Sequence, residues 1–244
     1  MFGDDVGAWK WFYPDGQTST QGSFVRDDRD GEWNWFRRDG SKSSTGQYRA
    51  GSKIGEWLTY YENGQVSSLK PYSYNKRHGK SYYYTENGEL YLVRFHRNGK
   101  LIGYSYASGP DQLVDMIPIA NGTAKVKATY PNGQTSSSFE YRNSFLEGPF
   151  TTFYPDGQKM EESVFEHGEL QGRSTEYYPS GSKRSEEEFY FGNRHGVCKY
   201  YHRNGKLKEE VNYILGRKYG TDTRFNEEGK VILKEIYHDG SLIE

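Results

Sequence analysis

Aromatic residues recur along the chain in two columns with a fixed period of 24 residues, and polar residues occupy most of the positions between them. No segment carries a sustained apolar stripe at helical spacing. Aromatic and β-branched side chains pack well on a pleated surface, so the stretches around both columns are predicted to be strands. The first column is Phe12, Phe36, Tyr60, Tyr84, Phe153, Tyr177, Tyr201 and Phe225, and the second is Phe24, Tyr48, Tyr72, Tyr141, Phe165, Phe189, Tyr213 and Tyr237.

A turn signal separates the two strands of each repeat. Residues 154–157 read Tyr-Pro-Asp-Gly, and residues 13–16 and 130–133 follow the same pattern. Proline and aspartate suit the middle of a type I turn, and glycine suits the left-handed position that follows. The signal therefore predicts a β-hairpin with a bulge at the glycine.

Three glycine series with the same period mark the turns and take up 24 of the 29 glycines. They divide the chain into ten repeats, of which 103–123 is shorter and degenerate, with Gln112 in place of the second glycine. We predict an all-β fold, an elongated single-layer antiparallel sheet of tandem 24-residue hairpins in a single array over residues 1–244. A five-bladed propeller is the alternative arrangement. The repeats start near residues 7, 31, 55, 79, 103, 124, 148, 172, 196 and 220.

Composition narrows the class of protein. Hydrophobic residues make up 33% of the chain and the mean hydropathy is −1.00, too polar for a conventional two-layer core. The aromatic content of 17% argues against disorder, because aromatic rings can pack while their edges stay wet. The net charge of −1 provides no general attraction to nucleic acid or to an anionic membrane. No apolar run of transmembrane length occurs, so neither a nucleic-acid partner nor an integral membrane segment is expected.

The repeat consensus resembles the variant MORN repeat. Residues 55–65, which read GEWLTYYENGQ, show the pattern well. Among proteins with such repeats, the chain looks most similar to bacterial YwqK-type proteins, which are named as antitoxin components of toxin–antitoxin modules. The resemblance implies stacked hairpins in one long antiparallel sheet and a binding or scaffolding role. It implies no catalytic residues.

The sequence offers no pattern typical of a catalytic, metal or cofactor site. Cys198 is the single cysteine and has no evident activating base, and the six histidines lack metal-ligand spacing. His78 and His195 both precede the first glycine of a repeat, which makes them turn residues. We therefore expect a protein without enzymatic activity, metal or cofactor.

All five tryptophans fall in the first three repeats. They occupy two positions of the repeat, here called slots, that lie two residues apart, and such positions face the same side of a strand. Tryptophan is enriched in binding hot spots, so this patch is the first candidate for partner binding. A packing ladder, or a contact surface for an upstream domain, is the structural alternative. The candidate residues are Trp9, Trp11, Trp33, Trp35 and Trp57.

The degenerate repeat contains the most aliphatic stretch of the chain. A long irregular loop within a regular array is often functional, and a loop that folds back to cover the thin sheet is the alternative. The candidate residues are Asp115, Met116, Ile117, Pro118 and Ile119.

These observations predict a non-enzymatic scaffold that recognises a protein. The resemblance to YwqK-type proteins implies that this partner is a toxin. A carbohydrate- or cell-envelope-binding module and a regulatory arm of a larger enzyme are the alternatives, and the chain looks like a piece of a longer protein. Unpaired terminal strands make end-to-end self-association a further expectation. The compartment stays open between the cytoplasm and, if a signal segment has been removed, the periplasm or cell surface.

Overall fold

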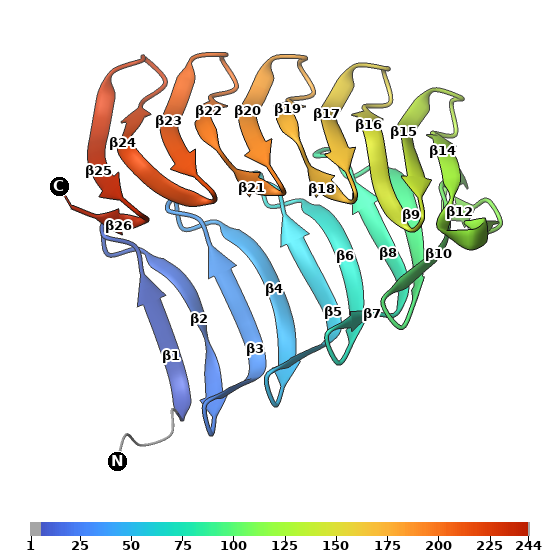
Figure 1. Cartoon of the computed structure of the whole chain (residues 1–244), viewed down its shortest axis with the longest axis horizontal. Helices are drawn as coiled ribbons and strands as arrows, with labels where there is room; N and C mark the ends of the chain where they lie inside the picture. The colour runs from blue at the N-terminus through green and yellow to red at the C-terminus, as the bar shows by residue number, and fades with distance from the viewer. Residues whose placement is uncertain (1–5, 244) are drawn as a thin grey trace. The chain divides into compact units, whose positions relative to one another are not determined.

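The computed structural model describes residues 6–243 as almost entirely β-structure, with no α-helix in that range (Figure 1). The chain divides into two compact units, unit 1 up to Ala120 and unit 2 from Asn121. The predicted all-β fold of antiparallel hairpins is confirmed. Each unit is an open sheet whose strands pair with their sequence neighbours, as tandem hairpins require.

Unit 1 contains one sheet of 11 strands in the order β1-β2-β3-β4-β5-β6-β8-β9-β10-β13, with β7 paired to β6, and a separate ribbon of β11 and β12. Its strands are β1 (Gly7–Phe12), β2 (Thr18–Val25), β3 (Asp28–Phe36), β4 (Lys42–Arg49), β5 (Ser52–Tyr60), β6 (Val66–Ser73), β7 (Lys76–Arg77), β8 (Gly79–Tyr84), β9 (Leu90–Arg97), β10 (Lys100–Ser105), β11 (Ala107–Gly109), β12 (Gln112–Leu113) and β13 (Ile117–Pro118).

Unit 2 contains one sheet of 13 strands, in which β18 and β21 are short additions to β17 and β20. A short 3-10 turn, η1 (Ala120–Gly122), leads into it. Its strands are β14 (Ala124–Thr129), β15 (Thr135–Arg142), β16 (Phe145–Phe153), β17 (Lys159–Glu166), β18 (Glu169–Leu170), β19 (Gly172–Tyr177), β20 (Lys183–Tyr190), β21 (Asn193–Arg194), β22 (Gly196–Tyr201), β23 (Leu207–Ile214), β24 (Arg217–Phe225), β25 (Val231–His238) and β26 (Ser241–Leu242).

The hairpin turns have the predicted chemistry. In the third repeat the Gly64 amide donates to the Tyr61 carbonyl over 3.0 Å, and the Tyr61 amide donates to the Gln65 carbonyl over 2.8 Å. Gly64 has a φ of 83°, a left-handed conformation that glycine adopts without a Cβ penalty. The predicted bulge at the turn glycine is therefore confirmed, and the strand register also shifts between Thr59 and Tyr60, at the end of β5 just before the turn.

A third aromatic column, which the sequence analysis did not single out, joins successive hairpins. In most repeats the residue just before the turn sends its side chain to a backbone carbonyl of the next repeat, 23 residues on. Tyr154 donates its hydroxyl to the Tyr177 carbonyl over 2.8 Å, and His202 places Nε2 2.9 Å from the Phe225 carbonyl oxygen. These bonds link the turn side of neighbouring hairpins through a side chain rather than through the strand ladder.

The degenerate repeat ends the first sheet. Because it lacks the turn glycine at position 112, β11 and β12 form a ribbon of their own, and β13 then pairs with the free edge of β10. The strand that would continue the array is thus displaced from that edge, and a second sheet begins at β14. The expected continuous sheet is instead two sheets, and their long strand paths are not the four-stranded blades of the propeller alternative.

Candidate partner-binding face

The structure brings all five tryptophans together on one face of unit 1. They come from β1, β3 and β5, and their rings follow one another in sequence order with centroids 6.1, 5.6, 6.0 and 5.5 Å apart. We call this series the tryptophan ladder: Trp9, Trp11, Trp33, Trp35 and Trp57. The expectation that slots two apart share a side of the strand agrees with these contacts.

Rings from the second strand of each hairpin pack edge-on between the indoles. The Phe24 ring meets Trp33 at 5.1 Å and 89°, and the Tyr48 ring meets Trp57 at 5.1 Å and 90°. Edge-to-face pairs contribute about 0.5–1.5 kcal/mol beyond area burial. The rings of the second aromatic column therefore pack between the indoles of the ladder and restrict their positions.

Two glycines outside the turn series make room for the ladder. Trp33 lies over the backbone of Gly22, and Trp57 lies over the backbone of Gly46. A Cβ added at Gly22 would sit 2.3 Å from the Trp33 ring, and one at Gly46 would sit 2.2 Å from the Trp57 ring. Both glycines precede their tryptophan by 11 residues, a spacing that was visible in the sequence but not used.

Burial separates the members of the ladder. Trp33 is fully buried and Trp57 is 8% exposed, so their rings serve mainly as the packing core of this unit. Trp9 and Trp11, on the terminal strand β1, are each 38% exposed, and Trp35 is half-buried. The packing alternative therefore fits the inner members, while the accessible surface belongs to Trp9, Trp11 and Trp35.

Cations cover the inner rings. The Arg29 guanidinium lies 4.4 Å from the Trp33 ring centroid, and the Lys53 ammonium lies 4.1 Å from the Trp57 ring centroid. A cation over an indole face is stabilised by the ring quadrupole. The face thus combines aromatic area with positive charge.

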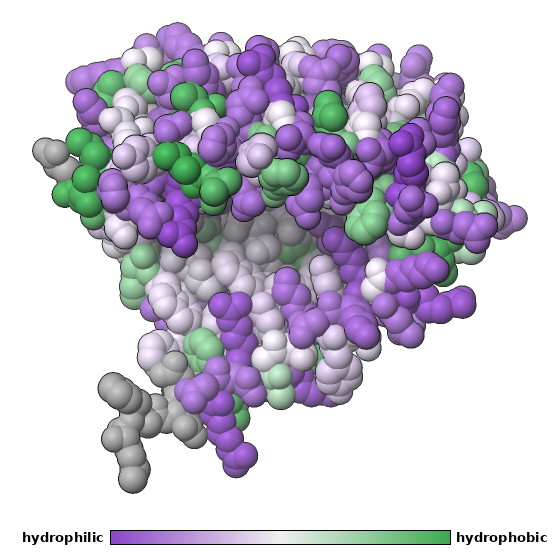
Figure 2. All heavy atoms as spheres, viewed as in Figure 1, coloured by the Kyte–Doolittle hydropathy of each residue, from purple (hydrophilic) through white to green (hydrophobic). Residues whose placement is uncertain are grey.

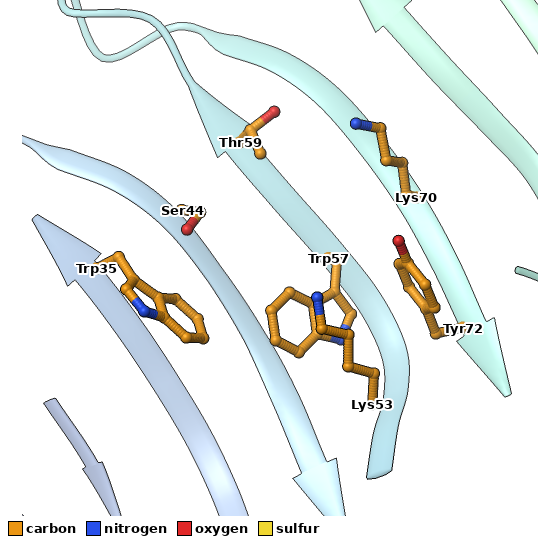
Figure 3. Close-up of a pocket in the computed structure, with 7 residues that line it drawn as sticks. All are labelled: Trp35, Ser44, Lys53, Trp57, Thr59, Lys70 and Tyr72. Atoms are coloured by element: carbon orange, nitrogen blue, oxygen red, sulfur yellow. The ribbon is translucent and has the colours of Figure 1, made fainter. Parts of the chain in front are cut away.

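A hollow of ≈ 280 Å³ opens beside Trp57 (Figure 3). Two cross-strand pairs, Trp35 with Ser44 and Trp57 with Lys70, form part of its wall. In Figure 3 the Lys53 side chain extends across the Trp57 ring. Burial lowers the pKa of the Lys70 ammonium. The hollow is lined by Trp35, Ser44, Lys53, Trp57, Thr59, Lys70 and Tyr72.

The second sequence candidate, residues 115–119, lies at the other end of the same sheet. Ile117 and Pro118 form β13, and the Ile119 amide donates to the Ile102 carbonyl over 3.0 Å. Ile119 is buried, whereas Met116 is 42% exposed, and Asp115 and Pro118 are also exposed. The segment covers an edge rather than a face of the sheet, and β6, β8, β9 and β10 separate it from β5, the nearest strand of the ladder.

Unit 2 carries a smaller exposed aromatic pair, Tyr190 and Phe191, which are 46% and 61% exposed with ring centroids 4.5 Å apart. Hydrophilic residues cover most of the face visible in Figure 2, with hydrophobic residues in small separate groups. Cys198 is buried, and burial raises the pKa of its thiol. Within residues 6–243 no group of three or more histidine, cysteine or acidic side chains is arranged to hold a metal ion, and no helix has the length and apolarity to cross a bilayer.

Comparison with known proteins finds the repeat family in part of the chain. Five segments match the MORN repeat variant, at residues 5–25, 53–74, 146–167, 170–190 and 194–214. The predicted resemblance is confirmed for these repeats. No curated protein gives a match, so the likeness to YwqK-type proteins stays a prediction.

Two solved structures show a remote similarity to the chain. A crystal structure of TcdB2–TccC3 is 11% identical with a TM-score of 0.18, and the Photorhabdus luminescens Tc holotoxin pore with a TccC3 mutation is 14% identical with a TM-score of 0.16. The matches cover 95% and 96% of this chain but 19% and 13% of those chains. Scores this low support no conclusion about fold or function.

Proposed function

We propose, on the premise of its five MORN-type segments, that this chain is a non-catalytic scaffold whose tryptophan ladder recognises a partner protein. MORN repeats are in general modules that bind proteins or membranes. A toxin, as the likeness to YwqK-type antitoxins implies, is one candidate partner.

The observation that carries the proposal is the exposure of Trp9 and Trp11. Each indole leaves 38% of its surface accessible although both rings continue a packed ladder. Single exposed hydrophobic residues are ordinary, but adjoining indoles form a contiguous apolar surface. Tryptophan supplies large contact area at low conformational-entropy cost, and it dominates many interface hot spots.

The test is an affinity capture from lysate of the source cells with the full chain and matched variants. Trp11→Ala combined with Trp35→Ala removes accessible indoles and leaves the buried Trp33 and Trp57 in place. Tyr219→Ala, at an aromatic residue of unit 2 that is 42% exposed, is the control. We expect a specific protein to be retained by the wild type and the control and to be lost from the double variant, with thermal melts confirming that all three chains fold.

Two results would overturn the proposal. One is the absence of any specifically retained protein. The other is equal retention by the double variant, which would place the binding surface elsewhere. Binding of the wild type to an array of glycans, lost in the double variant, would move the assignment to carbohydrate recognition, since exposed aromatic rings also suit sugar faces.

A further inference from the structure

The repeat positions around one lysine carry different side chains in the two units. In unit 2, Lys218 occupies the slot that Lys53 occupies in unit 1, two residues before the first glycine of a repeat. The Lys218 ammonium lies 2.5 Å from an Asp222 carboxylate oxygen and 3.8 Å from a Glu209 carboxylate oxygen. The lysine of unit 2 therefore shares two carboxylates of its own sheet with Arg224, which lies 3.2 Å from an oxygen of each.

Both of these carboxylates are replaced in unit 1. Trp57 stands in the slot of Asp222, and Ser44 stands in the slot of Glu209. A third acidic slot changes sign, because Lys70 stands where unit 2 has Glu235. Thr59 stands in the slot of Arg224, so the exchange removes three carboxylates and one guanidinium and adds one ammonium at equivalent places of the repeat.

The hollow lies where these exchanges occur. Ser44, Lys53, Trp57 and Lys70 all line it, and its lining contains two ammonium groups and no carboxylate. Within the described residues 6–243, neither Lys53 nor Lys70 forms an ion pair. A half-buried ammonium without a counter-charge is costly, so the site is complementary to an anion.

The rest of the lining restricts the class of anion. Ser44 and Thr59 bring hydroxyl groups, and Trp35, Trp57 and Tyr72 bring aromatic walls. The volume of ≈ 280 Å³ lies near the lower end of small-ligand pockets, which span roughly 300–1,000 Å³. A side chain with a methylene stem and a carboxylate end matches both the walls and the charges. The net charge of −1 gives no general attraction to an anionic lipid surface, which favours a peptide over a membrane.

We propose that the hollow beside Trp57 receives a glutamate or aspartate side chain of the partner protein, in the place that Asp222 and Glu209 fill within unit 2. The assignment rests on the proposed function and adds the chemistry of the partner segment. The ammonium groups of Lys53 and Lys70 donate to the carboxylate, and the indoles pack against its methylene stem.

The direct test uses the full chain and a blocked hexapeptide of alternating leucine and glutamate. In an extended peptide this alternation places the carboxylates on one face and the leucines on the other. The control peptide has glutamine in place of glutamate. Binding is followed by tryptophan fluorescence and by the NMR shift of the Lys70 Nζ group, whose pKa is expected to rise when a carboxylate binds.

Three variants and one control variant sharpen the result. Lys53→Gln and Lys70→Gln are each expected to weaken glutamate-peptide binding roughly tenfold or more, because charge-assisted hydrogen bonds are the strong ones. Ser44→Glu restores a carboxylate at the slot of Glu209 and is expected to abolish binding while both lysines remain. Lys199→Gln, at a half-buried lysine of unit 2 paired with Glu210, is expected to change nothing.

The proposal is overturned if the glutamate peptide fails to bind at millimolar concentration, or if the glutamine peptide binds equally. It is also overturned if the glutamate peptide binds the Ser44→Glu variant as tightly as the wild type. Binding to phosphatidylserine vesicles that the peptide does not displace would assign the site to a membrane instead. A captured protein that survives Lys53→Gln and Lys70→Gln but not the tryptophan changes would retain the proposed function and overturn this inference.

Discussion

The substitution Gly46→Ala tests whether packing of the tryptophan ladder requires a residue without a side chain at position 46 of β4. The new Cβ would lie 2.2, 2.3 and 2.7 Å from three carbons of the Trp57 ring. Ordinary carbon–carbon contacts are about 3.5–4.0 Å, so the indole or the strand must move by about 1 Å or more. Trp57 is held by Tyr48 at 5.1 Å and by Trp35 at 5.5 Å, which leaves it little space.

Overpacking of a well-packed site costs about 1–3 kcal/mol, and we expect Gly46→Ala to lower the free energy of unfolding of unit 1 by that amount. The effect opposes the ordinary consequence of Gly→Ala, which stabilises by about 0.4–1 kcal/mol where the backbone accepts alanine. Gly46 has no left-handed φ that would by itself disfavour alanine. A decrease in the free energy of unfolding would therefore indicate a clash with the Trp57 indole, and an increase would indicate that no such clash occurs.

Urea denaturation followed by tryptophan emission is the assay. All five tryptophans lie in unit 1, so the emission reports that unit selectively. Gly109→Ala is the matched control, because its added Cβ meets only the Gln112 side chain at an ordinary 3.6 Å. We expect the control to stay within about 0.5 kcal/mol of the wild type.

A double-mutant cycle isolates the contact. In a Trp57→Leu background the ring is absent, and Gly46→Ala should be neutral or slightly stabilising when unfolding is followed by circular dichroism. The coupling energy would then be about 1–3 kcal/mol. A neutral or stabilising Gly46→Ala in the wild-type background would refute the reasoning.

Two further predictions concern the side-chain hydrogen bonds between repeats and the response to acid. Tyr154→Phe removes the 2.8 Å hydrogen bond to the Tyr177 carbonyl at a side chain that is 3% exposed. We therefore expect the free energy of unfolding, measured by chemical denaturation, to fall by about 1 kcal/mol, with faster amide exchange at the turn. Unchanged stability and exchange would contradict a role for this bond. Burial, with Arg77 and Arg94 nearby, lowers the pKa of His96 to about 4 from its usual 6.5. The unfolded chain therefore binds more protons than the folded chain between these values, and this histidine's contribution to stability, complete above pH 6.5, is lost as the pH falls towards 4. His96→Gln should flatten that part of the stability profile relative to the wild type, and an identical profile for both proteins would argue against the assignment.

The two units show how one repeat backbone supports different surfaces. The Lys218 slot in unit 2 is surrounded by carboxylates, and the Lys53 slot in unit 1 is surrounded by aromatic rings and hydroxyl groups. Strand pairing and turn geometry are the same in both. The two units therefore differ in the side chains that occupy the inner slots and not in the backbone, as is general for different surfaces carried by a common fold.

Local signals determined the repeat, its turns and the strand character of both aromatic columns. A left-handed glycine such as Gly64 and the alternation of faces along a strand depend on a few neighbouring residues, so the sequence was enough to predict them. The sequence also placed the tryptophans on one side of their strands. The resemblance to the variant MORN repeat rested on the same local pattern.

Only the tertiary structure decided which of those residues are accessible and where the sheet ends. Burial of Trp33 depends on Gly22 and Phe24 in the preceding hairpin, and the exposure of Trp9 depends on its place on a terminal strand. The end of the first sheet at β13 depends on an edge pairing with β10 that no repeat pattern encodes. These properties arise from contacts between strands, whereas a period along the chain constrains each strand mainly through its own residues.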